Sequence, residues 1–289
     1  MAVHDKTDAL VPFPVAWVDA PPTVSRRLVL GSGVGALLGG LGAVALLLDG
    51  EYPLGFTTAL IAAFFGASAH ISSRAWRWPG RRRPLVDSVD GIGLRFRAGA
   101  GGWRFTVGAM VAGVPFGVAL GWAAYHDPTP TGRTWVALVN SPILLGWCLF
   151  QLWNVATGCL RRGEVLLTPE GVTYSAWGDR FSLPWDRAAR VDAELSPGLG
   201  RRAAPGVRVT RRPGFCTSHE RTARGFSSTA TSHLPDLVVR ADQVEGDPAL
   251  LAHALAFYAT HHELLEELGD ARALERVRSG RAVAPHLAR

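Results

Sequence analysis

Four long stretches of the chain contain no Asp, Glu, Lys or Arg. They are residues 28–48, 52–73, 105–125 and 134–160. An α-helix rises about 1.5 Å per residue, so about 20 apolar residues cross the hydrocarbon core of a bilayer. Each stretch is long enough to do so, and short segments separate the first from the second and the third from the fourth. The sequence therefore predicts a transmembrane region over residues 28–160, with four helices arranged as two hairpins.

The rest of the chain has the composition of a soluble protein. Charged residues make up 19% of the whole chain, and every one of them lies outside the four stretches. The remaining segments therefore contain at least the roughly 25% of charged residues that is usual in soluble domains. The percentage of charged residues in the whole chain is therefore low because it includes the four uncharged stretches predicted to be membrane helices.

Arginines that flank the four stretches indicate their orientation. They precede the first stretch, recur through residues 74–104 and follow the fourth stretch, whereas the two opposite loops contain only Arg133. Cytoplasmic loops of membrane proteins are enriched in Lys and Arg, so both termini are expected in the cytoplasm. We expect a multi-pass protein of the cell (inner) membrane, with residues 1–27 as a cytoplasmic tail and residues 74–104 as a cytoplasmic basic loop.

The first stretch has two other interpretations. Gly31, Gly33 and Ala36 match a dinucleotide-binding fingerprint, but the helix of that motif is amphipathic and residues 28–48 are almost uniformly apolar. Arg26 and Arg27 before an apolar run also resemble a twin-arginine export signal. Because three further uncharged stretches follow, a retained membrane helix is the preferred interpretation.

Small residues recur every four positions in the first and third stretches. They are Gly31, Gly35 and Gly39 in the first, and Gly113, Gly117 and Gly121 in the third. Such a row lies on one face of a helix and allows another helix backbone to approach closely. We expect these glycines to pack helices within one bundle. A dimerisation face is the alternative, and the oligomeric state is left open.

Few polar side chains interrupt the uncharged stretches. His70 lies near the end of the second stretch, and Cys148, Gln151, Asn154 and Thr157 form an i, i+3 row near the end of the fourth. Polar side chains within a membrane are costly and are often functional. Hydrogen bonding between helices is the simpler interpretation of this row. A transport or enzyme site among Gln151, Asn154 and His70 is the alternative.

The second half of the chain has a pattern typical of short strands. The segments 164–167, 171–177, 180–184, 189–195, 207–211 and 236–240 have strand composition and are separated by turn residues. Asp247 followed by Pro248 then predicts the start of an amphipathic helix that ends at Gly269, and a shorter helix over 270–279 precedes the tail. This order of elements indicates an α+β domain.

Two runs in this half resemble a known family. The run VLLTPEGVTY at residues 165–174 and the run FSLPWD at residues 181–186, followed by the closing helix, are similar to bacterial pleckstrin-homology-like (PH-like) domains attached to membrane helices, particularly those of actinobacteria. The resemblance covers about residues 163–269. It implies an open β-barrel or sandwich capped by a C-terminal helix over 250–269. It also implies a binding or scaffolding module without catalytic residues, and leaves residues 270–289 as a short helix and tail.

An earlier segment repeats part of this pattern. Residues 81–94 parallel residues 161–174, with Asp90-Gly91 in the place of Glu170-Gly171, and each segment follows a predicted helical hairpin. One interpretation is a duplication in which residues 84–97 pair with the main sheet and supply a further strand. The other is that both segments follow a membrane hairpin and contain similar turn residues without being related.

Arginines are concentrated between residues 196 and 235. They are Arg201, Arg202, Arg208, Arg211, Arg212, Arg221 and Arg224, against the single acidic residue Glu220. Basic groups near the inner leaflet are attracted to its anionic lipids. We expect these arginines to bind anionic lipid headgroups or an acidic protein partner, or the acidic helix of their own domain. A solvated, disordered loop is the alternative, because the segment is rich in Ser and Thr.

The sequence contains no nucleophile elbow, phosphate-binding loop or HExxH motif. Cys216, His219 and His233 supply at most three zinc ligands, so no metal and no cofactor are expected. The basic segment has few interleaved aromatic residues, so nucleic acid is not an expected partner.

We therefore expect a non-enzymatic membrane protein that displays a cytoplasmic PH-like module for a protein partner or anionic lipid. A small membrane transporter or membrane enzyme is the alternative.

Overall fold

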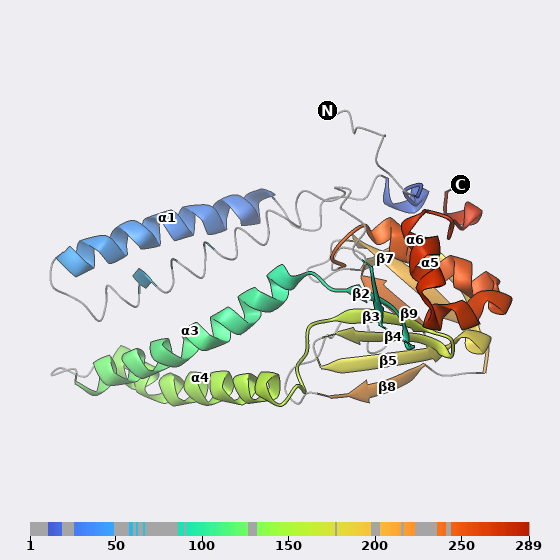
Figure 1. Ribbon diagram of the computed structural model, residues 1–289. Helices are drawn as coiled ribbons and strands as arrows, with labels where there is room; N and C mark the ends of the chain where they lie inside the picture. The colour runs from blue at the N-terminus through green and yellow to red at the C-terminus, as the bar shows by residue number, and fades with distance from the viewer. Residues whose placement is uncertain are drawn as a thin grey trace. The chain divides into compact units, whose positions relative to one another are not determined.

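The computed structural model describes residues 11–18, 26–48, 58–59, 62, 66, 86–89, 91–126, 132–176, 178–197, 203–214, 217–222, 236–240 and 244–288. The chain forms two compact units (Figure 1). The first, called the domain below, combines Met1–Thr23, Arg77–Ala100 and Arg161–Arg289. The second, called the helical unit, combines Val24–Trp76 and Gly101–Leu160. The protein is thus a mixed α+β structure in which the domain is assembled from three separate parts of the sequence.

The helical unit contains the helices α1 (Arg26–Leu48), α3 (Ala100–Tyr125) and α4 (Gly132–Ala156). Two segments in it, Thr106–Tyr125 and Thr134–Ala156, are long and apolar enough to cross a membrane, and only 17% of an apolar 18-residue stretch of each is buried. A core helix of a soluble protein would instead be mostly buried. Large apolar side chains are exposed along all three helices, among them Leu37, Leu41, Val118, Ile143 and Trp153.

Two helices among the described residues therefore meet the length of a span, where the sequence predicts four. In α1 the apolar helix Leu30–Ala45 is shorter than a span. The predicted span at 52–73 lies outside the described residues, except for Thr58, Ala59, Ala62 and Gly66, which are helical.

One antiparallel sheet of the domain has six strands in the order β1-β2-β3-β4-β5-β8. Their bounds are β1 (Asp87–Val89), β2 (Gly93–Arg97), β3 (Glu164–Thr168), β4 (Gly171–Ala176), β5 (Asp179–Pro184) and β8 (Ser218–Arg221). Burial alternates along β3, where Val165 and Leu167 face the core. This period of two is what a sheet with one buried face requires.

Within the predicted segment 84–97, β1 and β2 belong to the main sheet. Leu94 pairs with Leu167 and Arg97 with Glu164, so β2 lies in the interior of the sheet. A Cβ atom on Gly93 would overlap the carbonyl oxygen of Leu167, so this approach requires glycine. The strand pairing that the first interpretation of the sequence echo predicts is therefore confirmed for residues 87–89 and 93–97.

The other antiparallel sheet has three strands, β6 (Ala188–Pro197), β7 (Ala203–Arg211) and β9 (Leu237–Arg240), in the order β6-β7-β9. The single helical turn η2 (Trp185–Arg187) connects β5 to β6. β8 is not predicted by the sequence, because all four of its side chains are exposed and the segment lacks the apolar alternation of a strand.

The predicted helix from Pro248 to Gly269 is interrupted. It divides into α5 (Pro248–Thr260) and the 3₁₀ segment η4 (His262–Gly269), and α6 (Ala271–Arg278) and η5 (Pro285–Leu287) follow. His261 has non-helical backbone angles, and its Nδ1 atom lies 2.9 Å from the carbonyl oxygen of Phe257. Such local contacts of side chains with the last carbonyls compete with the helix. The start of α5 is as predicted, since the Asp247 side chain accepts a hydrogen bond from the Ala249 N–H at 3.0 Å.

α5 is buried on all sides rather than along one face, from Pro248 to Tyr258. It contacts β6 on one side. The N-terminal segment with the helical turn η1 (Val15–Trp17) and the C-terminal tail pack into the same core, where Val11, Trp17 and Leu287 are buried. Residues 11–18, predicted as part of a tail, are therefore an integral part of the domain.

Candidate functional site

The predicted arginine site does not form a single loop. Arg208 and Arg211 lie in β7, whereas Arg221 lies in β8 of the other sheet. Arg208 places Nε 2.9 Å from a carboxylate oxygen of Glu194 and Nη1 3.7 Å from Asp236. Strand pairing thus brings the arginines next to carboxylates of neighbouring strands, a relation that sequence spacing does not reveal.

Of the other predicted arginines, the structure describes Arg212. Arg212 follows β7 and is exposed. The remaining members of the set lie outside the described residues: Arg201, Arg202 and Arg224.

A buried carboxylate contacts two side chains of β8, the edge strand of the six-stranded sheet. Asp179 is 1% exposed, and its Oδ1 lies 3.0 Å from Nε2 of His219 and 3.8 Å from Nε of Arg221. The His219 ring stacks on Phe181, its register partner, at 4.6 Å between centroids. His219, which the sequence suggests as a zinc ligand, therefore contacts Asp179 and stacks on Phe181 at the edge of the core.

Metal binding has no support within the part of the chain that is described, where no three His, Cys, Asp or Glu side chains lie close enough to hold an ion. Cys216 and His233, the other two residues of the zinc interpretation, are outside those ranges.

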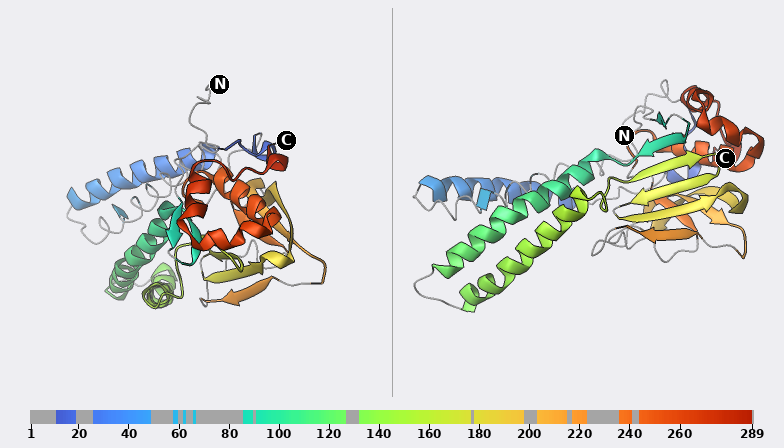
Figure 2. Two further views of the ribbon diagram at one scale, coloured as in Figure 1. Left: turned by 45° about the vertical axis from the view of Figure 1, so that its right-hand side comes forward. Right: turned by 60° about the horizontal axis from the view of Figure 1, so that its bottom comes forward.

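Glycines of α3 contact α4, and the two helices lie side by side in antiparallel directions (Figure 2). A Cβ atom on Gly117 would lie 3.4 Å from Leu145 Cβ, one on Gly113 would lie 2.5 Å from Cys148 Sγ, and Gly121 is similarly close to Ser141. This face of α3 therefore packs directly on α4, which is the close backbone approach that small residues allow.

The first glycine row has a comparable contact. A Cβ atom on Gly39 would lie 3.1 Å from Ala62 Cβ, and Gly66 faces Ala36 in the same way at 3.6 Å. Residue numbers rise along α1 as those of its partners fall, so the two segments are antiparallel. Gly31 has open space around it, and no contact is described for Gly35.

Two amides on α4 have buried polar atoms that lack a hydrogen-bond partner among the described residues. Gln151 is fully buried, and neither Nε2 nor Oε1 has a partner. Asn154 is 6% exposed, and its Nδ2 is likewise unpaired. An unpaired amide in an apolar environment costs about 1–3 kcal/mol. The sequence predicts an alternative transport or enzyme site among Gln151, Asn154 and His70. Gln151 and Asn154 are described, whereas His70 lies outside the described residues.

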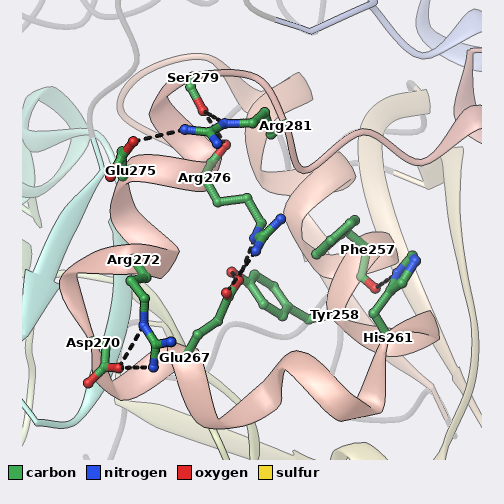
Figure 3. A network of polar contacts seen from close by, with 10 residues as sticks. All are labelled: Phe257, Tyr258, His261, Glu267, Asp270, Arg272, Glu275, Arg276, Ser279 and Arg281. Atoms are coloured by element: carbon green, nitrogen blue, oxygen red, sulfur yellow. Dashed lines mark hydrogen bonds and ion pairs between the residues drawn. The ribbon is translucent and has the colours of Figure 1, made fainter.

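A closed polar network joins α5, η4 and α6 (Figure 3). The Glu267 carboxylate accepts two hydrogen bonds from Arg276, at 2.6 and 3.0 Å, and one from the Tyr258 hydroxyl at 2.8 Å. Burial raises the pKa of Tyr258, and its bond to Glu267 adds to the increase. Burial also opposes ionisation of Glu267, but the Arg276 and Tyr258 hydrogen bonds outweigh it and lower the pKa of that carboxyl. Every member has its partners, so the network serves to fasten the C-terminal elements together.

His253 links both ends of the chain. The backbone N–H of Ala284 donates to Nδ1 of the ring at 3.1 Å, so Nε2 carries the proton and donates to the carbonyl oxygen of Pro12 at 2.8 Å. The side chain is fully buried. Burial lowers the pKa of His253, and the neighbouring His286 contributes to the same shift. No local pattern in the sequence indicates this role, because the three partners are remote from one another along the chain.

Comparison with protein families, with curated proteins and with solved structures finds no match to this chain.

Proposed function

We propose that this chain is a multi-pass protein of the cell membrane that displays its domain in the cytoplasm as a non-catalytic PH-like binding or scaffolding module. Both termini would lie on the cytoplasmic side. The domain would bind a protein partner, and the two helical hairpins would hold it at the inner leaflet.

The observation that carries the topology is the assembly of the domain from three separate segments. Residues 11–18, 86–98 and 161–288 share one compact unit. Because the chain leaves this unit and returns to it twice, each excursion crosses a bilayer an even number of times. The antiparallel contacts of Gly39 with Ala62 and of Gly117 with Leu145 support two crossings in each excursion.

Exposed aromatic residues support the membrane location. Trp122 and Tyr125 lie at the end of α3, Trp135 lies at the start of α4, and Trp153 lies near the end of α4. Trp and Tyr are enriched where membrane helices meet the headgroups. The excess of arginines on the domain side supports a cytoplasmic orientation by the same statistical rule.

Labelling of single cysteines in intact cells tests the topology. In a chain whose three native cysteines are replaced by serine, a cysteine at His126 should react with a membrane-impermeant maleimide added outside. A cysteine at the exposed Ser279 should react only after the cells are permeabilised. Labelling of both positions, or of neither, in intact cells would contradict the proposal.

The architecture of the domain supports a PH-like module. Two antiparallel sheets enclose one core, and the helix α5 after the last strand is buried against it. A protein partner is favoured over anionic lipid because Arg208 and Arg221 lie within 4 Å of carboxylates that offset their charge. Paired arginines attract headgroups less than free ones do.

Crosslinking from native membranes tests the binding function. The full-length protein should capture a defined protein partner, and a protein truncated after Leu160 should not. Binding to lipid vesicles tests whether the ligand is lipid instead of protein. If the purified protein in nanodiscs clusters anionic vesicles and not neutral ones, and captures no protein, lipid would replace protein as the ligand.

The unpaired amides favour a second candidate function, a small transporter or membrane enzyme with a polar site on α4. Alanine at Gln151 and at Asn154 separates the two candidates. Lost function with unchanged abundance in the membrane would support the second. Retained function in these variants, together with loss in a protein truncated after Leu160, would support the binding module.

A further inference from the structure

The N-terminal segment 11–18 contacts the rest of the domain through every third side chain. Val11, Pro14 and Trp17 are buried, and the positions between them are half-buried or exposed. Pro14 has φ −55° and ψ 128°, close to the angles of a polyproline II helix, and the 3₁₀ turn η1 follows it. Both conformations have three residues per turn. The three buried side chains therefore lie along one side of the segment.

Three elements of the domain hold this segment, and each supplies a hydrogen-bonding group. His253 of α5 donates from Nε2 to the carbonyl oxygen of Pro12 at 2.8 Å. The indole N–H of Trp17 donates to the carbonyl oxygens of Glu194 in β6 and Gly206 in β7, at 3.2 and 3.3 Å. These two residues are register partners. We call the surface formed by these groups of α5, β6 and β7 the docking surface.

The contacts are of the kind that bound peptides make. Residues 11–18 contain no strand, so the segment does not extend either sheet. Phe13 packs edge to face against Trp17, with 5.7 Å between the ring centroids, and Trp is enriched among the residues that dominate binding energy. Proline restricts a free peptide, so a segment that contains it loses less entropy when it binds.

We propose that the docking surface is the peptide-binding site of the domain, and that residues 11–18 occupy it as a tethered ligand. The site would take a peptide of a partner protein with the same spacing. That spacing is an aliphatic residue, a proline three positions later and a tryptophan three positions after the proline. The proposal rests on the proposed function, because it names the site and the partner chemistry of that binding module.

Burial decides how a partner would enter. Trp17 is 0% exposed and Val11 is 2% exposed, and both belong to the core of the domain. An empty docking surface would expose that core to water, which is unfavourable. The partner peptide therefore replaces the tethered segment, and the surface stays filled. A ligand on a short flexible linker acts at an effective concentration in the millimolar range, so the native protein should bind a free peptide weakly.

Binding of a fluorescent peptide to the full-length protein in nanodiscs tests the proposal. The probe is a synthetic peptide of residues 9–20 of this chain. Trp17→Ala protein should bind it at least about tenfold more tightly than the native protein, because truncation of a buried Trp anchor weakens the tethered segment by at least that factor. Val15→Ala, at a position that is 50% exposed, is the matched control and should bind like the native protein. A peptide that itself carries Trp17→Ala should bind to none of them.

Thermal unfolding keeps the test decisive if Trp17→Ala protein folds poorly. A ligand that binds only the folded state raises stability, so excess native peptide should shift the unfolding midpoint of Trp17→Ala toward that of the native protein. A peptide that neither binds Trp17→Ala nor shifts its midpoint would overturn the proposal. Equal binding by native and Trp17→Ala protein would overturn the occupancy of the site by the tethered segment.

Competition with the partner separates this proposal from the proposed function. Excess native peptide should block the capture of a protein partner by crosslinking in native membranes, and the Trp17→Ala peptide should not. Capture that the native peptide leaves unchanged would retain the binding function and reject the docking surface as its site. Binding of the peptide without capture of any partner would confirm the site and reject the proposed partner.

Discussion

The imidazole of His253 donates a hydrogen bond to the carbonyl oxygen of Pro12 at 2.8 Å, although the two residues are 241 positions apart in the chain. Through Nδ1 the same ring accepts from Ala284. One neutral side chain therefore secures both the N-terminal segment and the C-terminal tail to α5.

The domain should lose stability as the pH falls below about 6.5, the ordinary pKa of His. The pKa of His253 is lower in the folded domain, so the unfolded chain binds the proton more tightly. The stabilisation is fully present above the ordinary pKa and is lost as the pH falls from there toward the folded value. A protonated ring can no longer accept from Ala284. Thermal unfolding of the full-length protein between about pH 5 and pH 8 measures the effect.

His253→Gln removes the titrating group and should flatten the pH dependence over this range. His262→Gln, at an exposed position of η4, is the matched control and should preserve it. An unchanged pH profile in His253→Gln would contradict the assigned role.

Removal of the charge on Glu267 should destabilise the domain by about 2 kcal/mol, because Arg276 would lose its buried counter-charge and an amide has one acceptor oxygen where the carboxylate accepts three hydrogen bonds with two. Glu267→Gln is the test, measured by urea unfolding monitored by fluorescence. Glu275→Gln breaks the exposed pair with Arg281 and should cost less than about 1 kcal/mol. Equal effects of the two variants would show that burial adds nothing to the Glu267 network.

Sequence periodicity predicted the strands β3, β4, β5, β6, β7 and β9, because apolar alternation and turn residues are local signals. The start of α5 at Asp247 was predicted for the same reason. Its early end was not, because the contacts of Thr260 and His261 with helix carbonyls compete with the next turn only in the folded environment.

The sequence predicted which types of residue form the candidate site, but not which residues they contact. The charge count indicated arginines, but the pairing of β6 with β7 places Arg208 opposite Asp192 and brings its Nε within 2.9 Å of the Glu194 carboxylate. Likewise the burial of Trp17 depends on carbonyl oxygens of Glu194 and Gly206, which are remote in sequence. Contacts of this kind have no local signature, so composition cannot distinguish a docked segment from a tail.

The N-terminal segment should be required for the fold of the domain. Trp17 is fully buried, and its indole N–H donates to the carbonyl oxygens of Glu194 and Gly206 at 3.2 and 3.3 Å. Trp17→Ala should therefore cost about 3–5 kcal/mol. Val15→Ala, at a half-exposed position of the same turn, should cost less than about 1 kcal/mol. Unfolding of both variants in detergent, followed by tryptophan fluorescence, compares them.

A related expectation concerns the isolated second half of the chain. Residues 161–289 expressed alone lack β2 and the N-terminal segment, so Leu167 and Val207 would lose buried neighbours and the product should aggregate. A chain in which a short turn connects Ala98 to Gly163, and a flexible linker replaces residues 26–76, should be soluble and folded. Ala98 and Gly163 are already hydrogen-bonded, so the turn requires no rearrangement. A folded, monomeric 161–289 fragment would contradict this view of the domain.

Gln151→Leu should leave the stability of the helical unit unchanged or raise it by about 1 kcal/mol. The native amide is fully buried, and neither of its polar atoms has a partner in the part of the chain that the structure describes, so a side chain of similar size without polar atoms removes a desolvation cost. Thermal unfolding in detergent micelles measures the change. Asn140→Leu is the control, because the Asn140 amide is exposed and donates to the carbonyl oxygen of Val136 at 2.8 Å. A clear loss of stability in Gln151→Leu would mean that the amide has a partner in the membrane, and would favour a structural hydrogen bond over a polar site kept for function.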